Sequence, residues 1–261
     1  MIHIINPDRW PTAKVQYFNV CQHFSRFERV SEIDPGLLEE RLWALDERRF
    51  SSTRIQLTSV TDLGDSVASI LEIGPGSGHF SSIMKALEYS VKTADIKSRT
   101  NPDYLGDFRD TEIPEKFDLV AAFEMLQHLP YADLPKTLAK LSELSNKYVL
   151  ISVPSRVHRF ELSIEIPAML APRRLGLGWI RGKHSISATW EWPRGRDRLK
   201  ETWEGREDYW NPHYWEIGRK SFPRSRFLSD IESAGLRILW HKYNPRHTHH
   251  LFVLAEKVPS E

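Results

Sequence analysis

The sequence predicts an α/β fold built on a doubly wound, mostly parallel sheet with helices on both faces. Between about residue 69 and residue 154, short apolar runs of strand length alternate with segments that place apolar residues at helical spacing. Such alternation is typical of parallel sheets whose strands are joined by crossover helices. The same rhythm resumes at Phe222 and ends in two apolar runs joined by the short turn NPRHTH. This ending predicts an antiparallel strand pair that closes the sheet.

Seven strands and several helices follow from this pattern. The strands are expected at the apolar runs Ser69–Ile73, Val91–Ile96, Asp103–Gly106, Phe117–Phe123, Tyr148–Val153, Leu236–Tyr243 and His250–Lys257. Helical spacing predicts two helices between residues 34 and 63, and one each over 79–89, Ala132–Leu144 and Ser225–Ala234. We therefore expect a seven-stranded sheet that is parallel except for its C-terminal hairpin.

Three regions are expected along the chain. Residues 1–66 form an N-terminal helical extension, in which Asp34 and Pro35 have the pattern of an N-cap followed by proline at the first helical position. Residues 67–258 form the main domain. The alternation of strand-like and helix-like segments stops over residues 154–222. This stretch is too long for a plain loop and predicts an inserted, aromatic-rich cap.

Composition excludes several functions. The 36 basic and 35 acidic side chains give a net charge of +1, so no bulk field is expected to recruit duplex nucleic acid or an anionic membrane. Cys21 is the only cysteine, which excludes an internal disulfide and a cysteine-built metal site and fits a reducing compartment. The chain shows no leader pattern at its start and no uncharged stretch near the length of a membrane span. The expected location is the cytoplasm.

The segment EIGPGSGHF, residues 72–80, lies between the first expected strand and a helix. Glycines suit a turn with unusual dihedral angles against which a ligand approaches the backbone closely. A nicotinamide-binding loop, G-x-G-x-x-G, would place its third glycine at position 79, where this chain has His79. The spacing therefore disfavours a dinucleotide site, and a plain structural turn remains the other alternative.

Asp95 ends the second expected strand about twenty residues beyond this loop, where a carboxylate can accept hydrogen bonds from both ribose hydroxyls. A further segment, EMLQHLP over residues 124–130, follows the fourth strand. The residues EIGPGSG resemble the first motif of class I S-adenosylmethionine-dependent methyltransferases. EMLQHLP is similar to that family's E-x-L-x-H-L/V-P segment, with Gln127 where many relatives carry Glu.

The resemblance covers roughly half of the chain, from Ser69 to Pro154 and again over the last two strands. It implies a Rossmann-like fold, S-adenosylmethionine as cofactor with S-adenosylhomocysteine as product, and no metal. Glu72 would organise the methionine end, Asp107 would accept the adenine amino group, and Phe108 would pack on the ring. The complete set of cofactor contacts that we expect is Glu72, Gly74, Pro75, Gly76, Gly78, Asp95, Ile96, Asp107, Phe108, Glu124 and Met125.

Methyl transfer needs an aligned nucleophile, and an alcohol or phenol acceptor also benefits from a base near neutral pKa, for which histidine is the typical side chain. His128, His213 and His250 are the candidates. His128 follows the fourth strand at the carboxyl edge of the sheet, where ligands of open α/β folds bind. His213 lies in NPHYWEIG, a segment common in bacterial relatives, where Tyr214, Trp215 and Glu216 can form a pocket wall. Structural roles for all three histidines stay open.

The expected acceptor is a small molecule or a glycan. Six tryptophans fall between Pro154 and Phe222 and can stack on rings or form a small core of their own: Trp179, Trp190, Trp192, Trp203, Trp210 and Trp215. The chain lacks both the segment typical of base amino-methyltransferases and a cysteine nucleophile after the loop. The leading interpretation is an O-methyltransferase for a small molecule or a bacterial surface-glycan precursor. The alternatives are a non-catalytic cofactor-binding module and an NAD(P)-dependent oxidoreductase.

Overall fold

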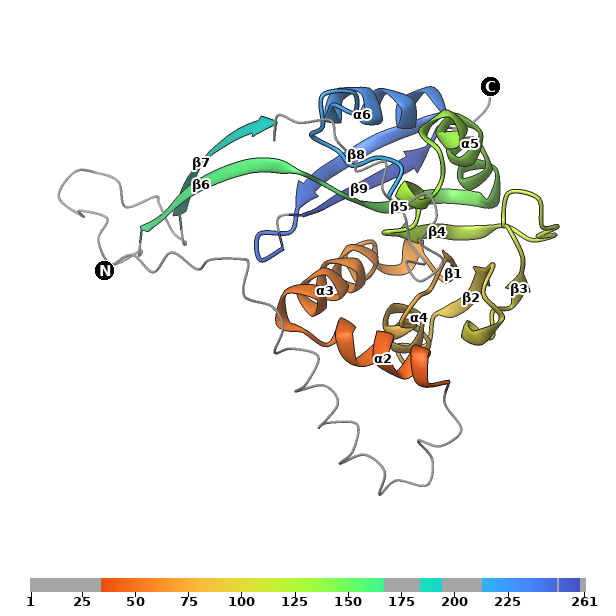
Figure 1. Ribbon diagram of the computed structural model, residues 1–261. Coiled ribbons are helices and arrows are strands. Elements are labelled where there is room, and N and C mark those ends of the chain that lie inside the picture. Colours follow the sequence, from red (N-terminus) through yellow and green to blue (C-terminus); the bar gives the residue numbers. More distant parts are fainter. Residues whose placement is uncertain (1–33, 167–183, 194–212, 248, 259–261) are drawn as a thin grey trace, which may run out of the picture.

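The computed structural model describes residues 34–166, 184–193, 213–247 and 249–258 (Figure 1). Seven strands form one sheet in the order β3-β2-β1-β4-β5-β9-β8. Neighbours from β3 to β5 are parallel, whereas β9 is antiparallel to both β5 and β8. The bounds are β1 Ser69–Ile73, β2 Ser90–Asp95, β3 Tyr104–Leu105, β4 Phe117–Phe123, β5 Ser145–Pro154, β8 Leu236–Tyr243 and β9 His250–Lys257. The predicted fold class is confirmed.

Helices cover both faces of this sheet. They are α2 Pro35–Ala44, α3 Glu47–Thr61, α4 His79–Ala86, α5 Leu134–Leu144 and α6 Arg224–Ser233. Figure 1 shows α5 and α6 on one side of the sheet and α2, α3 and α4 on the other. Short 3-10 turns complete the described connections: η2 Gly64–Ser66, η3 Ser98–Thr100, η4 Leu126–His128 and η5 Tyr131–Asp133.

Two local differences from the sequence expectations have physical causes. Helix α4 stops at Ala86 instead of reaching residue 89, because Glu88 takes a left-handed conformation with φ of 66° that ends the helix. Strand β3 is shorter than expected. The backbone nitrogen of Thr93 on β2 donates to the side chain of Asp103 at 2.8 Å and not to a backbone oxygen of the neighbouring strand. The expected N-cap is present, since the Asp34 carboxylate accepts from the nitrogen of Leu37 at 2.9 Å.

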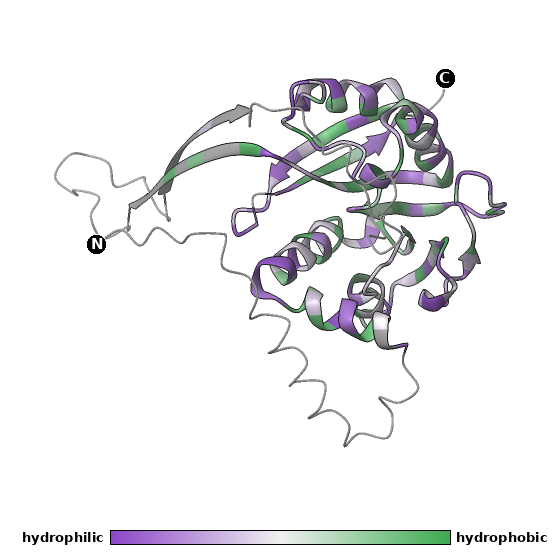
Figure 2. Ribbon diagram, in the orientation of Figure 1, coloured by the Kyte–Doolittle hydropathy of each residue, from purple (hydrophilic) through white to green (hydrophobic). Residues whose placement is uncertain are grey.

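The core has one cluster on each face of the sheet. Along β4, Val120 and Ala122 join the cluster that contains α5 and α6, whereas Leu119 and Ala121 join the cluster that contains α3 and α4. A strand that is buried on both faces is a continuous apolar run, which explains FDLVAAF. Figure 2 shows this hydrophobic character along the central strands and hydrophilic residues at the tip of the β8–β9 hairpin.

The described part of the insertion contains an antiparallel ribbon of β6 (Val157–Ile166) and β7 (His184–Pro193). The ribbon extends away from the seven-stranded sheet (Figure 1). Phe160 and Trp190 pair across it with ring centroids 5.5 Å apart, and both are about half exposed. Of the other tryptophans in the insertion, Trp179, Trp203 and Trp210 lie outside the described residues, and only the backbone of Trp192 is described.

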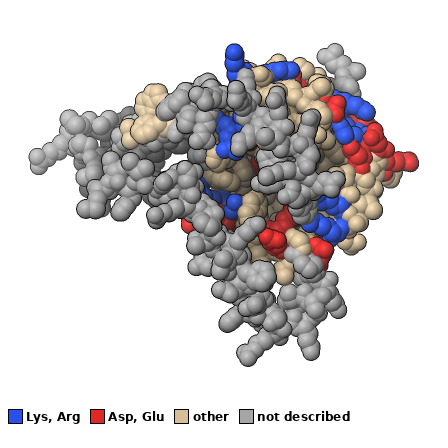
Figure 3. All heavy atoms as spheres, in the orientation of Figure 1, with Lys and Arg blue, Asp and Glu red and all other residues tan. Residues whose placement is uncertain are grey.

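The chain returns from the insertion into the core at Trp215, which is fully buried and packs against Tyr131 and Phe227. The sequence expectation that Trp215 helps to form a pocket wall is therefore wrong, because its side chain is enclosed in the core cluster that contains α5 and α6. Among the described residues, no helix is long and apolar enough to cross a membrane. Both basic and acidic side chains appear on the described surface in Figure 3.

Candidate active site

The glycine loop connects β1 to α4 through three left-handed residues. Gly74, Gly76 and Gly78 have φ values of 66°, 50° and 72°. The nitrogen of Gly74 donates to the oxygen of Ala94 at 2.8 Å, so the loop leaves the sheet beside the end of β2. The nitrogen of Gly78 donates to the oxygen of Pro75 at 2.8 Å, and Gly78 then becomes the N-cap of α4. Positive φ at all three positions explains why glycine is required.

Side chains from distant parts of the chain lie against this loop. A Cβ at Gly74 would approach the Cγ of Met125 to 3.1 Å, and one at Gly76 would approach a carboxylate oxygen of Glu40 to 3.1 Å. The Nε of Arg41 donates to the oxygen of Ser77 at 3.2 Å. The loop therefore has α2 on one side and the segment after β4 on the other.

Glu72 is buried at the end of β1, with 3 % of its surface exposed. Burial raises the pKa of its carboxyl group to about 8, a hydrogen bond from Ser81 opposes this only partly, and the charge of Asp95 raises it further. Its Oε2 has no hydrogen-bond partner among the described residues. A buried polar atom without a partner is costly and indicates a place where a ligand group belongs.

Asp95 ends β2, and both of its oxygens hold the turn that follows. Oδ1 accepts from the nitrogen of Lys97 at 3.0 Å, and Oδ2 accepts from the hydroxyl of Thr100 at 3.0 Å. A carboxylate offers about four acceptor positions, so these bonds leave capacity for the hydroxyls of a ribose. The neighbouring Ile96 is 70 % exposed.

Asp107 and Phe108 follow β3, and each has a partner within the protein. Asp107 pairs with Arg109 at 2.6 Å, and the hydrogen bond from this guanidinium lowers the pKa of the carboxyl group. Phe108 is only 5 % exposed and packs in the core cluster that contains α5. Their expected contacts with adenine remain predictions.

Glu124 follows β4 with φ of 49°, which is uncommon for a residue with a side chain and marks a strained position. Its nitrogen donates to the oxygen of Ser152 at 3.0 Å and contacts the hydroxyl of Ser152 at 3.1 Å, which holds the strained residue against β5. Burial raises the pKa of its carboxyl group to about 8. Its Oε1 has no partner among the described residues, as at Glu72.

The candidate histidines come together at the same edge of the sheet. The rings of His128 and His213 lie edge to face with centroids 5.1 Å apart. Two hydrogen bonds hold the His213 segment there: the nitrogen of Tyr214 donates to the oxygen of Gln127 at 2.9 Å, and the indole of Trp215 donates to the oxygen of Leu129 at 3.0 Å.

His250 begins β9 and is largely buried beside Glu124. Its Nδ1 is 2.8 Å from the hydroxyl of Ser52, and its Nε2 is 3.7 Å from the Glu124 carboxylate. Burial, reinforced by His247 and His249, lowers the pKa of His250 to about 3. This histidine is therefore neutral at physiological pH and ties β9 to α3.

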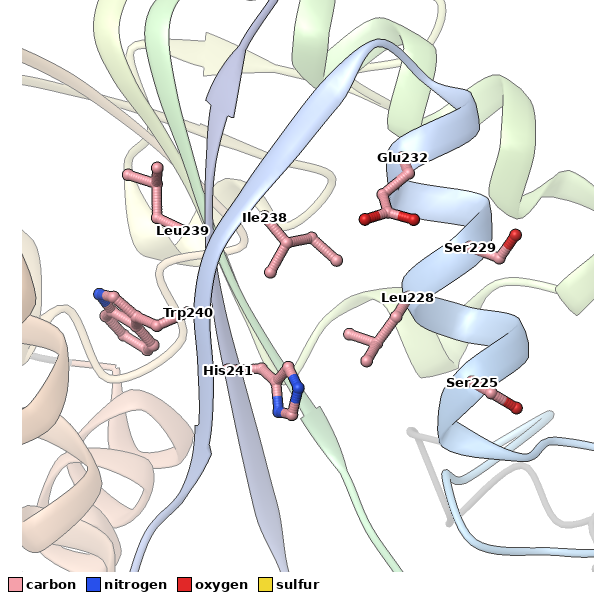
Figure 4. A pocket seen from close by; sticks show the side chains of 8 residues that line it. All are labelled: Ser225, Leu228, Ser229, Glu232, Ile238, Leu239, Trp240 and His241. Carbon is pink, nitrogen blue, oxygen red and sulfur yellow. The ribbon is translucent and has the colours of Figure 1, made fainter.

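A hollow of about 670 Å³ lies elsewhere, between α6 and β8 (Figure 4). Its lining includes Leu228, Ile238 and Trp240. Strands β4, β5 and β9 separate β8 from β1, so this hollow is not part of the site at the glycine loop. Among the described residues, no group of three His, Cys, Asp or Glu side chains is arranged to hold a metal ion.

The strand order, the left-handed glycine loop and the acids at the end of β1 and after β4 define the class of S-adenosylmethionine-dependent methyltransferases. A family model described as a methyltransferase domain matches residues 43–241, and the chain belongs to this family. S-adenosylmethionine is its cofactor. The residues present fit such a ligand, because Glu72 and Glu124 each have a buried carboxyl oxygen without a partner among the described residues, and a molecule with ammonium and sulfonium charges complements such acids.

Several solved structures are similar to this chain. Streptomyces venezuelae DesVI has a TM-score of 0.49 and 15% identity, over 88% of this chain and 100% of that chain. Magnesium protoporphyrin IX methyltransferase from Synechocystis PCC 6803, with bound S-adenosylhomocysteine, has a TM-score of 0.48 and 13% identity, over 94% and 99% of the two chains. The glycopeptide N-methyltransferase MtfA has a TM-score of 0.46 and 13% identity, over 79% and 90%. No curated protein matches the sequence.

Sequence reasoning missed several residues of this edge. Glu40 and Arg41 of α2 reach the glycine loop, and Ser81 bonds to Glu72. The first two carry no local signal, because their partners lie far along the chain. Ser81 had a weak signal, since it lies on the first turn of the helix that follows the loop.

Proposed function

We propose that the protein is an O-methyltransferase for a small molecule or a surface-glycan precursor, and that His213 is its general base. The observation that carries the proposal is the His128–His213 pair beside the segment that begins at Glu124. Displacement at the sulfonium methyl group requires an aligned nucleophile, and a hydroxyl nucleophile also loses a proton. A histidine at this edge supplies the proton acceptor.

Hydrogen bonding favours His213 over His128 as that base. The Gln127 side-chain nitrogen donates to the oxygen of Glu124 at 2.6 Å, which fixes the orientation of the amide. The same nitrogen lies 3.3 Å from the Nε2 of His128. Because an amide nitrogen only donates, that Nε2 is the acceptor in the contact and its lone pair is engaged. His128 then serves as a neighbour that packs against the ring of His213.

His250 is the weaker candidate for a different reason. A group whose pKa is lowered to about 3 has little affinity for the proton that a base must accept. Its Nδ1 is also engaged with Ser52, so we assign His250 to the framework that supports Glu124.

Exposed aromatic side chains support an acceptor that contains a ring. Phe160 and Trp190 are about half exposed on a ribbon that starts just after β5, and Tyr214 is 50% exposed next to His213. Aromatic faces stack on sugar and aromatic rings. These surfaces support a ring-containing acceptor with a free hydroxyl group, such as a sugar or a phenol.

The experiment measures release of S-adenosylhomocysteine with a panel of phenols, simple alcohols, sugars and nucleotide sugars. We expect turnover of at least one hydroxyl acceptor, and a loss of about 10²–10⁴-fold in kcat for His213→Gln. Calorimetry with S-adenosylhomocysteine should give the same affinity for both proteins. His241→Gln on the outer strand β8 is the matched control and should keep wild-type turnover.

Three outcomes contradict the proposal in different ways. Full activity of His213→Gln would remove this histidine as the base. Cofactor binding without turnover of any acceptor would favour the non-catalytic binding module. Tight NAD binding without S-adenosylmethionine binding would favour an oxidoreductase.

A further inference from the structure

Glu216 is held rigidly in the segment that carries His213. Trp215 on one side is fully buried, and Ile217 on the other donates its nitrogen to the oxygen of Pro154 at 2.9 Å. The nitrogen of Arg156 donates back to the oxygen of Ile217 at 2.7 Å. The backbone of Glu216 is therefore fixed against the end of β5, and its side chain is only 4% exposed.

The two oxygens of this carboxylate have different partners. Oε2 accepts from the Nε of Arg156 at 3.1 Å and from the Nε of Arg219 at 2.9 Å. Oε1 lies 3.0 Å from the Nδ1 of His213. Both arginines therefore donate to the same oxygen, Oε2, and the other oxygen, Oε1, is left to interact with His213.

The charge state of Glu216 follows from these partners. Burial alone would raise the pKa, yet the hydrogen bond from His213 and the charges of Arg156 and Arg219 outweigh it and lower the pKa to about 2. The carboxylate is ionised at any physiological pH. An ionised carboxylate only accepts hydrogen bonds, so the Nδ1 of His213 must carry the proton in this contact.

We propose that Glu216 is a positioning residue that fixes the Nδ1–H tautomer and the ring orientation of His213. The protonated nitrogen of an imidazole is set by the hydrogen bond that it makes, and the other nitrogen is then free to accept a proton. Nε2 of His213 is left as the acceptor nitrogen for the hydroxyl proton of the methyl acceptor. When that proton arrives, the imidazolium forms next to a carboxylate that stabilises it. This inference rests on the proposed role of His213 as the base.

The first test uses the unmodified protein in its complex with S-adenosylhomocysteine. ¹⁵N-edited NMR of the imidazole rings reports which nitrogen is protonated, and His213→Gln assigns the signal. We expect the Nδ1–H tautomer for His213. A dominant Nε2–H tautomer would overturn the inference, whatever the variants do.

The second test compares Glu216→Gln with Glu256→Gln, a matched control in which the carboxylate pairs with Arg237 at the sheet edge. For Glu216→Gln we expect a mixture of His213 tautomers and a loss of about 10–100-fold in kcat, with KM and cofactor affinity nearly unchanged. Glu216→Asp should recover part of the lost kcat. The control should leave the tautomer and kcat as in the wild type.

Failure of the inference is distinguishable from failure of the proposed function. Unchanged tautomer and unchanged kcat in Glu216→Gln would overturn the role of Glu216 while His213 remains the base. The Nδ1–H tautomer in a protein that turns over no acceptor would support the arrangement at Glu216 and contradict the methyltransferase activity proposed for the site.

Discussion

Glu40 on α2 and Arg99, which follows β2, form an ion pair with 2.7 Å between the carboxylate and the guanidinium. Both side chains are mostly buried, and the other carboxylate oxygen of Glu40 faces Gly76. Together with the hydrogen bond from Arg41 to Ser77, this pair holds α2 against the glycine loop. We infer that α2 closes the loop side of the cofactor site.

Loosening this contact should weaken cofactor binding. An ion pair near the surface contributes up to about 1 kcal/mol, so we expect Glu40→Gln to raise the dissociation constant for S-adenosylhomocysteine several-fold, mainly through faster dissociation. Calorimetry and stopped-flow fluorescence measure the two quantities. Glu39→Gln, an exposed neighbour on the same helix, is the control. Tighter binding by Glu40→Gln would instead show that Glu40 competes with the cofactor.

The glycine loop can be tested with two glycines in similar conformations. Gly76 and Gly64 have φ values of 50° and 56°, but a Cβ meets Glu40 at the first and nothing within 4 Å at the second. A side chain in this region costs about 1–2 kcal/mol of backbone strain. We expect Gly76→Ala and Gly64→Ala to lower the free energy of unfolding similarly, and only Gly76→Ala to lose cofactor affinity. Equal affinities in both variants would contradict contact between loop and cofactor.

Cofactor binding should release protons near neutral pH. The pKa of Glu72 is raised to about 8 mainly by burial, so its carboxyl group is mostly protonated at pH 7 in the free protein. A cationic ligand favours the ionised form and lowers that pKa. Calorimetric binding enthalpies in phosphate and in Tris should therefore differ by an amount that reports proton release.

The number of protons released should be smaller in Glu72→Gln. Glu124→Gln tests Glu124 in the same way, because the pKa of its carboxyl group is also raised to about 8. Proton release that persists unchanged in both variants would show that neither carboxyl group faces the cofactor.

Stability should fall with acid over the window set by His250. Its pKa is about 3 in the folded protein against an ordinary value of 6.5, so between these values the unfolded chain binds more protons. The free energy of unfolding then decreases as pH falls through that window, by up to about 1.4 kcal/mol per pH unit for one group. The lowered pKa of His247, about 4, acts in the same direction.

Urea denaturation between pH 6.5 and about pH 5.5 measures this slope, above the range where the carboxyl group of Glu216, whose pKa has an ordinary value of 4.5 in the unfolded chain, begins to titrate. We expect a flatter dependence in His250→Gln than in the wild type. Glu72 and Glu124 act with the opposite sign, because raised pKa values remove stability as pH rises from 4.5 toward about 8. Identical slopes for wild type and variant would contradict the burial of a neutral His250.

The loop geometry was open to prediction because its causes are local. The spacing of Gly74, Gly76 and Gly78 indicates backbone that needs positive φ, and all three residues have it. Apolar runs such as FDLVAAF predict strands buried on two faces without knowledge of their neighbours. The ends of α4 and β3 were less predictable. The left-handed conformation of Glu88 ends α4, and the hydrogen bond from the nitrogen of Thr93 to the side chain of Asp103 limits β3.

By itself, the sequence determined the class of fold, the strand elements and the conformation of the glycine loop, because strand periodicity and glycine dihedrals act within a few residues. Only the tertiary structure decided that His213 forms a hydrogen bond with Glu216, and that His250 is buried and neutral. His128 and His213 are in contact because Trp215 anchors its segment to Leu129, 86 residues away, and His250 lies beside Glu124 because β9 pairs antiparallel with β5. Such contacts depend on packing between distant elements, and no local pattern encodes them.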